Sequence, residues 1–179
     1  MDKTFFFLSG LPRSGSTLIG SILNQNPQLH VSPTSPVCDL FNMIEHDLRK
    51  CTVQYDYDFD QVRTNISFGF LDLFYKHIDK PVVIDKHRAW PRNTRGIKQT
   101  INSNPKIICT HRPIAAIITS FLKLIRSDPD NEVDKRLRIA GLELDTHNRA
   151  MFLWNEYVSD TYESFMLGLE ADPACLHVI

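Results

Sequence analysis

Eight residues near the amino terminus combine glycines, hydroxyl side chains and a cation. They read Gly10-Leu11-Pro12-Arg13-Ser14-Gly15-Ser16-Thr17, with the glycine spacing and the final Ser/Thr of a P-loop. Glycines let the backbone wrap around an oxyanion, and a following helix adds amide donors and its dipole. Ser16 stands where a nucleoside triphosphatase has its lysine, which argues against ATP hydrolysis. The loop therefore predicts an oxyanion site, and a tight turn without a ligand is the alternative.

Two later groups of residues could also hold anions. Asp85-Lys86-His87-Arg88 follows an apolar run at residues 82–84, and Arg112 follows another at residues 106–110. Ser120 lies eight residues after Arg112, in a helix that begins at Pro113. A lysine directly after a buried strand points toward the ligand crevice, and an arginine can bind phosphate with two hydrogen bonds.

The elements around these residues alternate between strand and helix. Apolar runs predict strands at residues 4–8, 29–31, 81–85, 106–110 and 175–179. Helical spacing predicts helices at residues 16–23, 37–48, 62–78, 92–101, 113–125 and 145–167, with a polar loop at 51–60 and a charged loop at 127–134. This order favours an α/β, three-layer, P-loop-like fold with a central, mainly parallel sheet flanked by helices. In such sheets ligands bind at the carboxyl ends of strands, where all three groups are expected.

Composition narrows the class of protein. The 179 residues carry 20 Lys and Arg against 21 Asp and Glu, a formal net charge of −1. This balance excludes a broad basic surface for nucleic acid or anionic membrane, but not a local anion pocket. No apolar run reaches the roughly 20 residues of a membrane span. The cysteines, at positions 38, 51, 109 and 175, lack zinc spacing, so we expect no metal site and a cytoplasmic location.

The first loop resembles that of a known enzyme family. Residues 7–18 are similar to the 5′-phosphosulfate loop of sulfotransferases, whose sulfuryl donor is 3′-phosphoadenosine 5′-phosphosulfate (PAPS). The form Pro-Arg-Ser-Gly-Ser-Thr resembles the tyrosylprotein and bacterial branches, as does Leu23-Asn24-Gln25-Asn26-Pro27. The family's second signature, an Arg and a Ser eight residues later that bind the 3′-phosphate, matches Arg112 and Ser120.

The resemblance implies a role for each matching residue. The 5′ end of the donor is expected at Gly10, Pro12, Arg13, Ser14, Gly15, Ser16 and Thr17. Lys86 matches the lysine that contacts the sulfuryl group in the tyrosylprotein branch, and Arg13 shares that task. The glutamate base of that branch is replaced by about Thr34, which cannot act as a base. His87, matching the histidine of cytosolic enzymes in an alignment shifted by one residue, is the first candidate for the base, and Asp39 is the second.

The resemblance implies in-line transfer of a sulfuryl group from PAPS to a hydroxyl or amine acceptor, without a metal. The acceptor is a small molecule, a carbohydrate or a peptide. Residues 1–179 would form a single domain, and we expect it to lack the family's C-terminal segment, because family domains continue after a strand like residues 175–179. Two alternatives remain open at this point, a P-loop small-molecule kinase with a degenerate loop and a non-catalytic nucleotide-binding fragment.

Overall fold

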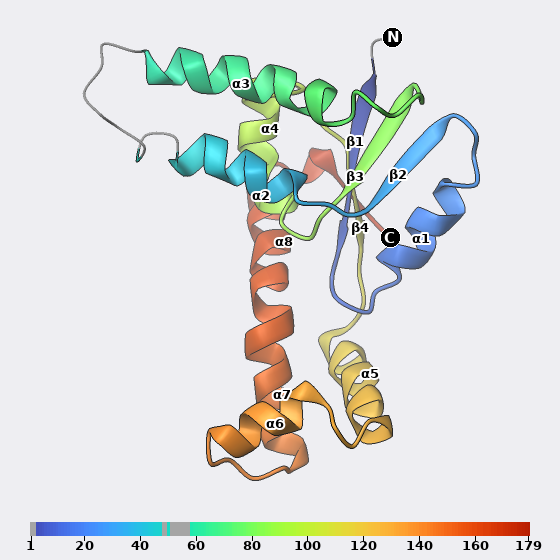
Figure 1. The fold of residues 1–179 in the computed structure, drawn as a ribbon, viewed down its shortest axis with the longest axis vertical. Coiled ribbons are helices and arrows are strands. Elements are labelled where there is room, and N and C mark those ends of the chain that lie inside the picture. The colour runs from blue at the N-terminus through green and yellow to red at the C-terminus, as the bar shows by residue number, and fades with distance from the viewer. Residues whose placement is uncertain (1–2, 48–49, 51–57) are drawn as a thin grey trace.

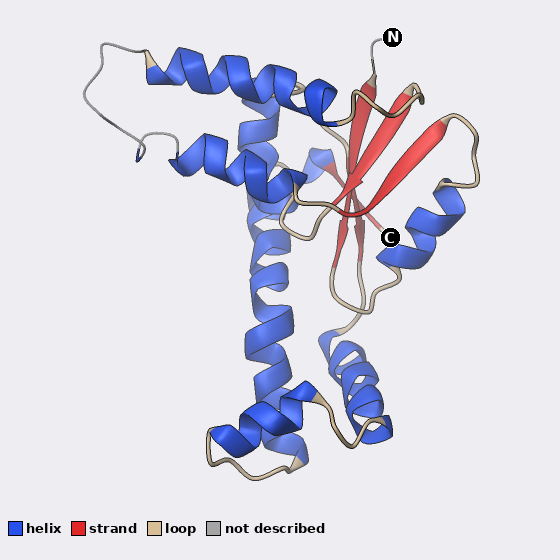
Figure 2. Cartoon of the chain, in the orientation of Figure 1, coloured by secondary structure: helices blue, strands red, loops and turns tan. Residues whose placement is uncertain are grey.

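A parallel β-sheet forms the centre of the computed structural model, which describes residues 3–47, 50 and 58–179. Its five strands lie in the order β2-β3-β1-β4-β5, and every neighbouring pair is parallel (Figure 2). The strands are β1 (Thr4–Gly10), β2 (Leu29–Thr34), β3 (Val82–Lys86), β4 (Ile107–Thr110) and β5 (Leu176–Val178). Helices flank the sheet on both faces, so the predicted three-layer α/β, P-loop-like fold is confirmed (Figure 1).

The two faces of the sheet bury different helices. On one face Leu8, Val31 and Ile84 pack against Ile19 and Leu23 of α1 (Ser16–Leu23). The larger core lies on the other face, where Phe5 and Phe7 of β1 are buried. Its helices are α2 (Val37–Asn42), α3 (Phe59–Phe74), α4 (Thr94–Thr100) and α8 (Ser159–Ala171). This division follows from the alternation of side chains along a strand, which sends Phe7 and Leu8 to opposite faces.

A group of helices continues the fold beyond the carboxyl ends of β1 and β4, at the bottom of Figure 1. It consists of α5 (Ile114–Ser127), α6 (Glu132–Ile139) and α7 (Thr146–Leu153), and a π-helical turn at Trp154–Val158 joins α7 to α8. Ile125, Val133, Leu137 and Leu153 form the buried core between these helices. The position of this group matters for function because α5 follows directly on Arg112.

Most predicted elements occur close to their expected positions. The helix predicted at residues 16–23 is α1, with the same bounds. The helix predicted at 37–48 is α2 followed by a π-helical turn at Met43–Asp47, and residue 48 lies outside the described residues, as does the predicted polar loop up to residue 57. The predicted long helix begins at Thr146 and, through the π-helical turn, extends to Ala171.

One prediction is wrong, because the charged loop expected at residues 127–134 contains the start of α6. The Asn131 side chain caps this helix by accepting a hydrogen bond from the backbone N–H of Asp134 at 2.8 Å. Arg149 of α7 donates two hydrogen bonds to the Asp134 carboxylate, at 2.7 and 2.8 Å. The sequence of α6 is mostly charged, and Val133 and Leu137 are its only buried apolar residues. Two such residues are too few for the helical spacing to be recognised from the sequence.

Candidate functional site

The loop between β1 and α1 is shaped by contact with the end of β4. The backbone N–H of Leu11 donates to the Thr110 carbonyl at 3.1 Å, which brings Gly10 against that residue. A Cβ atom added to Gly10 would lie 1.9 Å from Thr110 Oγ1 and 2.8 Å from its carbonyl oxygen. Glycine is therefore required here because no side chain fits, and the loop is fixed where strands β1 and β4 end.

Two left-handed residues complete the turn of the loop. Arg13 has a φ angle of 61° and Gly15 one of 97°. That conformation is strained for a residue with a side chain, and strain of this kind concentrates at functional sites. The Ser14 hydroxyl lies within the loop, donating to the Leu11 carbonyl at 2.5 Å and sharing a 2.5 Å hydrogen bond with Thr110 Oγ1. Ser14 thus holds the loop together, while Ser16 and Thr17 line the space in front of it.

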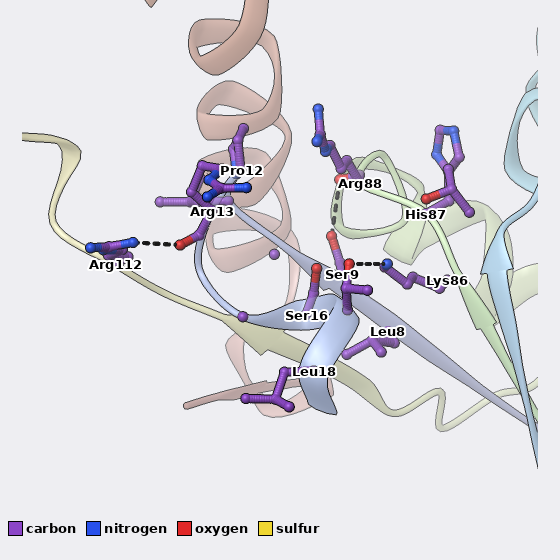
Figure 3. A pocket seen from close by; sticks show the side chains of 15 residues that line it. Leu8, Ser9, Pro12, Arg13, Ser16, Leu18, Lys86, His87, Arg88 and Arg112 are labelled. Carbon is purple, nitrogen blue, oxygen red and sulfur yellow. Dashed lines mark hydrogen bonds between the residues drawn. The ribbon is translucent and has the colours of Figure 1, made fainter. Parts of the chain in front are cut away.

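That space is a pocket of about 410 Å³ at the carboxyl ends of β1 and β3 (Figure 3). The described residues that line it include no Asp or Glu, and its cations are Arg13, Lys86, Arg88 and Arg112. Of the residues predicted to bind the donor or to act on it, the pocket also contains Gly10, Pro12, Gly15, Ser16, Thr17 and His87. Sequence elements far apart in the chain therefore form one positively charged pocket that suits an anion.

Lys86, the last residue of β3, forms a hydrogen bond with the first turn of α1. Its backbone lies in register with Leu8 of β1, and its Nζ donates to Thr17 Oγ1 at 2.9 Å. Partial burial, and then the nearby charge of Arg88, lower the pKa of Lys86 from its ordinary value. The ammonium group of Lys86 is thus held beside Thr17, at the start of α1.

The residue before Lys86 is a fully buried carboxylate that sequence reasoning did not single out. Asp85 accepts hydrogen bonds from the Ser35 and Tyr75 hydroxyls, and from Trp90 Nε1 at 2.6 Å. Burial and the Asp85 charge raise the pKa of the Tyr75 hydroxyl, which therefore stays a donor. These bonds tie β3 to α3 and to the loop before α2, and so fix the strand end that carries Lys86. The sequence signal was an acidic residue inside an apolar strand, which needs partners when buried.

Tyr75→Phe should lower the free energy of unfolding by about 2 kcal/mol, because it removes one hydrogen bond to a buried carboxylate. Urea denaturation followed by circular dichroism measures the change. Tyr157→Phe is the matched control, because no described residue is a hydrogen-bond partner of its hydroxyl, and it should change stability by less than about 0.5 kcal/mol. Equal stability of the two variants would show that the Tyr75 hydroxyl does not support Asp85.

Arg112 and Ser120 lie beside the loop rather than apart from it. Arg112 Nη1 donates to the Arg13 carbonyl at 2.9 Å, and Arg13 Nε donates to Ser120 Oγ at 3.2 Å. Together with Ala115, Ala116, Thr119 and Lys123, Arg112 and Ser120 line a second space of about 380 Å³ along α5. Arg112 belongs to both spaces, so the two predicted anion stations adjoin.

The two candidate bases lie together. His87 Nε2 is 3.5 Å from Asp39 Oδ2, and His87 Nδ1 accepts a hydrogen bond from the Ala89 backbone N–H at 3.2 Å. Thr34, at the position of the glutamate in the resemblance, lines the pocket. This pairing was not evident from the sequence, where Asp39 and His87 belong to different segments.

Two further observations concern metals and membranes. Within residues 3–47, 50 and 58–179, no group of three or more His, Cys, Asp or Glu side chains is placed to hold a metal ion. None of the helices in this part of the chain has both the length and the apolar composition needed to cross a lipid bilayer.

Comparison with known proteins places this geometry in a family. No curated protein matches the chain. Among solved structures, it is similar to a sulfotransferase domain from the curacin biosynthetic pathway, with 18% identity and a TM-score of 0.55 over 100% of this chain and 67% of that one. A thymidylate kinase from Candida albicans matches with 13% identity and a TM-score of 0.39, over 99% of this chain and 83% of that one. The model of the sulfotransferase family matches residues 6–163, and the chain therefore belongs to the sulfotransferase family.

Proposed function

We propose that the protein transfers a sulfuryl group from PAPS to a hydroxyl or amine acceptor by in-line displacement. The observation that carries this proposal is the pair of adjoining spaces that share Arg112, one in front of the loop and one along α5. A donor with phosphate groups at both its 5′ and 3′ ends requires two such anion stations. Family membership supports the same reading over the P-loop kinase, which the missing loop lysine also disfavours.

The donor's 5′ end would lie in the loop. Glycine amides and the start of α1 offer backbone N–H donors there, and the hydroxyls of Ser16 and Thr17 face the same space. Arg13 and Lys86 would neutralise the negative charge that develops on the sulfuryl oxygens and on the departing 5′-phosphate. Such preorganised charge is the main contribution that a protein makes to a transfer reaction of this kind.

His87 would remove the proton from the acceptor hydroxyl. With Asp39 facing Nε2, the ring proton of neutral His87 resides on Nε2, and Nδ1 remains the basic nitrogen. An acceptor hydroxyl would have to displace the 3.2 Å hydrogen bond that Nδ1 accepts from the Ala89 N–H. Asp39 would thus orient the His87 ring. In this arrangement the two residues that were candidates for the base act together, His87 as the base and Asp39 as its positioning residue.

Binding of 3′-phosphoadenosine 5′-phosphate (PAP), compared with ATP plus magnesium, tests the proposal directly. Thermal shift and calorimetry should show stabilisation by PAP, since a ligand that binds only the folded state raises its stability. Stabilisation by ATP with magnesium alone would overturn the sulfotransferase proposal. PAP binding without sulfation of any acceptor from PAPS would instead favour the non-catalytic nucleotide-binding alternative.

Arg112→Gln should weaken PAP binding about 30-fold, because a charge-assisted phosphate contact is lost. Binding of adenosine 5′-phosphate, which lacks the 3′-phosphate, should change less than about threefold. Isothermal titration calorimetry measures both affinities, and Arg126→Gln, an exposed arginine at the other end of α5, is the matched control. Equal losses for the two nucleotides would mean that Arg112 shapes the loop through the Arg13 carbonyl instead of binding the 3′-phosphate.

A further inference from the structure

One cation of the pocket has no side-chain partner among the residues that the structure describes. Arg13 donates to Ser120, Lys86 donates to Thr17, and Arg112 donates to the Arg13 carbonyl. Arg88 lines the same pocket, but its guanidinium forms no hydrogen bond or ion pair with any residue of the described part of the chain. Arg88 is also not among the residues proposed above to bind the donor.

The backbone of Arg88 is nevertheless fixed from two sides. Its carbonyl oxygen accepts hydrogen bonds from Ser9 Oγ of β1 at 3.0 Å and from Ser164 Oγ of α8 at 3.3 Å. The neighbouring His87 donates its backbone N–H to the Leu8 carbonyl at 3.0 Å. The backbone that carries the Arg88 side chain is thus held in place, and this lowers the entropy cost of binding a ligand there.

The surroundings of the guanidinium favour an anion. Arg88 as a residue is exposed, yet the protein near its charged end displaces enough water to lower its pKa. Lys86 adds a second positive charge nearby, and no Asp or Glu is among the described residues that line the pocket. A partly desolvated cation beside a like charge gains free energy when an oxyanion binds to it.

The direction of the side chains separates Arg88 from the donor. In Figure 3 the Lys86 side chain extends toward Ser16, whereas the side chains of His87 and Arg88 both extend away from Lys86 and diverge from each other. His87 and Arg88 are nevertheless adjacent in the chain and line the same pocket, so a molecule in this pocket that presents its hydroxyl to His87 could place an anionic group at Arg88. This step rests on the proposed function, because it takes His87 as the base.

We propose that Arg88 binds an oxyanion on the acceptor, so that the preferred acceptors are hydroxyl or amine compounds that carry a carboxylate or phosphate-like group. A planar guanidinium can bind either group with two parallel hydrogen bonds. Arg88 is then a specificity-determining residue that holds the acceptor while His87 faces its hydroxyl.

Calorimetry on the full chain saturated with PAP tests this proposal with three probes of similar shape. They are 4-hydroxyphenylacetate, 4-hydroxybenzylphosphonate and the uncharged 4-hydroxyphenylacetamide, and the two anions distinguish a carboxylate site from a phosphate-like one. At least one anion should bind about tenfold more tightly than the amide. Arg88→Gln should abolish this preference and Arg88→Lys should keep part of it. Arg95→Gln, which removes an exposed arginine of α4 outside the pocket, should leave the preference intact.

The outcomes distinguish a failure of the proposed function from a failure of the role proposed for Arg88. If PAP fails to bind, the proposed function is wrong and the role of Arg88 is wrong with it. If PAP binds but neither anion binds more tightly than the amide, or if Arg88→Gln keeps the preference, the role of Arg88 is overturned while the donor site stands. Partial preference in Arg88→Lys, with an unchanged melting temperature, excludes misfolding as the cause of the loss.

Discussion

Lys86→Ala should lower the rate of sulfuryl transfer by about 100- to 1000-fold, the usual cost of removing one preorganised donor from developing charge. Lys86 lies at the end of β3 with its Nζ at 2.9 Å from Thr17 Oγ1, at the mouth of the phosphate loop. Its contribution should grow as negative charge moves onto the sulfuryl oxygens and the 5′-phosphate. The loss should therefore fall on kcat, while the affinity for PAP changes less than about fivefold.

The measurement is the rate of product formation from PAPS, with PAP affinity determined by calorimetry on the same variants. Lys86→Arg keeps the charge with a different geometry and should recover part of the rate. Lys76→Ala, which removes an exposed lysine after α3 and outside the pocket, is the matched control and should retain the full rate. A Lys86→Ala enzyme with an unchanged kcat would show that the lysine does not act on the transferred group.

Gly10→Ala should lower the free energy of unfolding by about 3 kcal/mol, because its Cβ would overlap Thr110. The new atom would lie 1.9 Å from Thr110 Oγ1 and 2.8 Å from the Thr110 carbonyl oxygen. A rotation of the Thr110 side chain relieves only the first of these contacts, since the second is with backbone. The loop would move away from β4, and PAP binding should be lost together with stability.

Gly69→Ala is the control, and it should change the free energy of unfolding in the opposite direction. Gly69 lies within α3, and a Cβ atom there would meet nothing within 4 Å. Because alanine favours a helix over glycine, this variant should gain about 0.5–1 kcal/mol. Urea denaturation of both variants measures the difference. Similar stabilities for Gly10→Ala and Gly69→Ala would contradict the close contact between the loop and β4.

The local features of this protein could be predicted from its sequence. The strand before the phosphate loop, the bounds of α1 and the strand ends before Lys86 and Arg112 all depend on short patterns of apolar residues, glycine and proline. The pairing of such segments into a parallel sheet also follows from their alternation with helices. The short helix α6 was missed because its mostly charged sequence contains only two buried apolar residues, Val133 and Leu137, and its ion pair between Asp134 and Arg149 becomes visible only when α7 packs beside it.

The sequence by itself determined which residue types stand at the ends of the strands, and so the kind of ligand that we propose for the site. Only the tertiary structure decided how these side chains pair: Arg13 with Ser120, Asp39 with His87, and Asp85 with Ser35, Tyr75 and Trp90. It also left the Arg88 guanidinium without a partner among the described residues. The reason is physical, because strand and helix patterns depend on neighbours in the chain, whereas the partner of a polar side chain depends on which distant segments the sheet and its helices bring together.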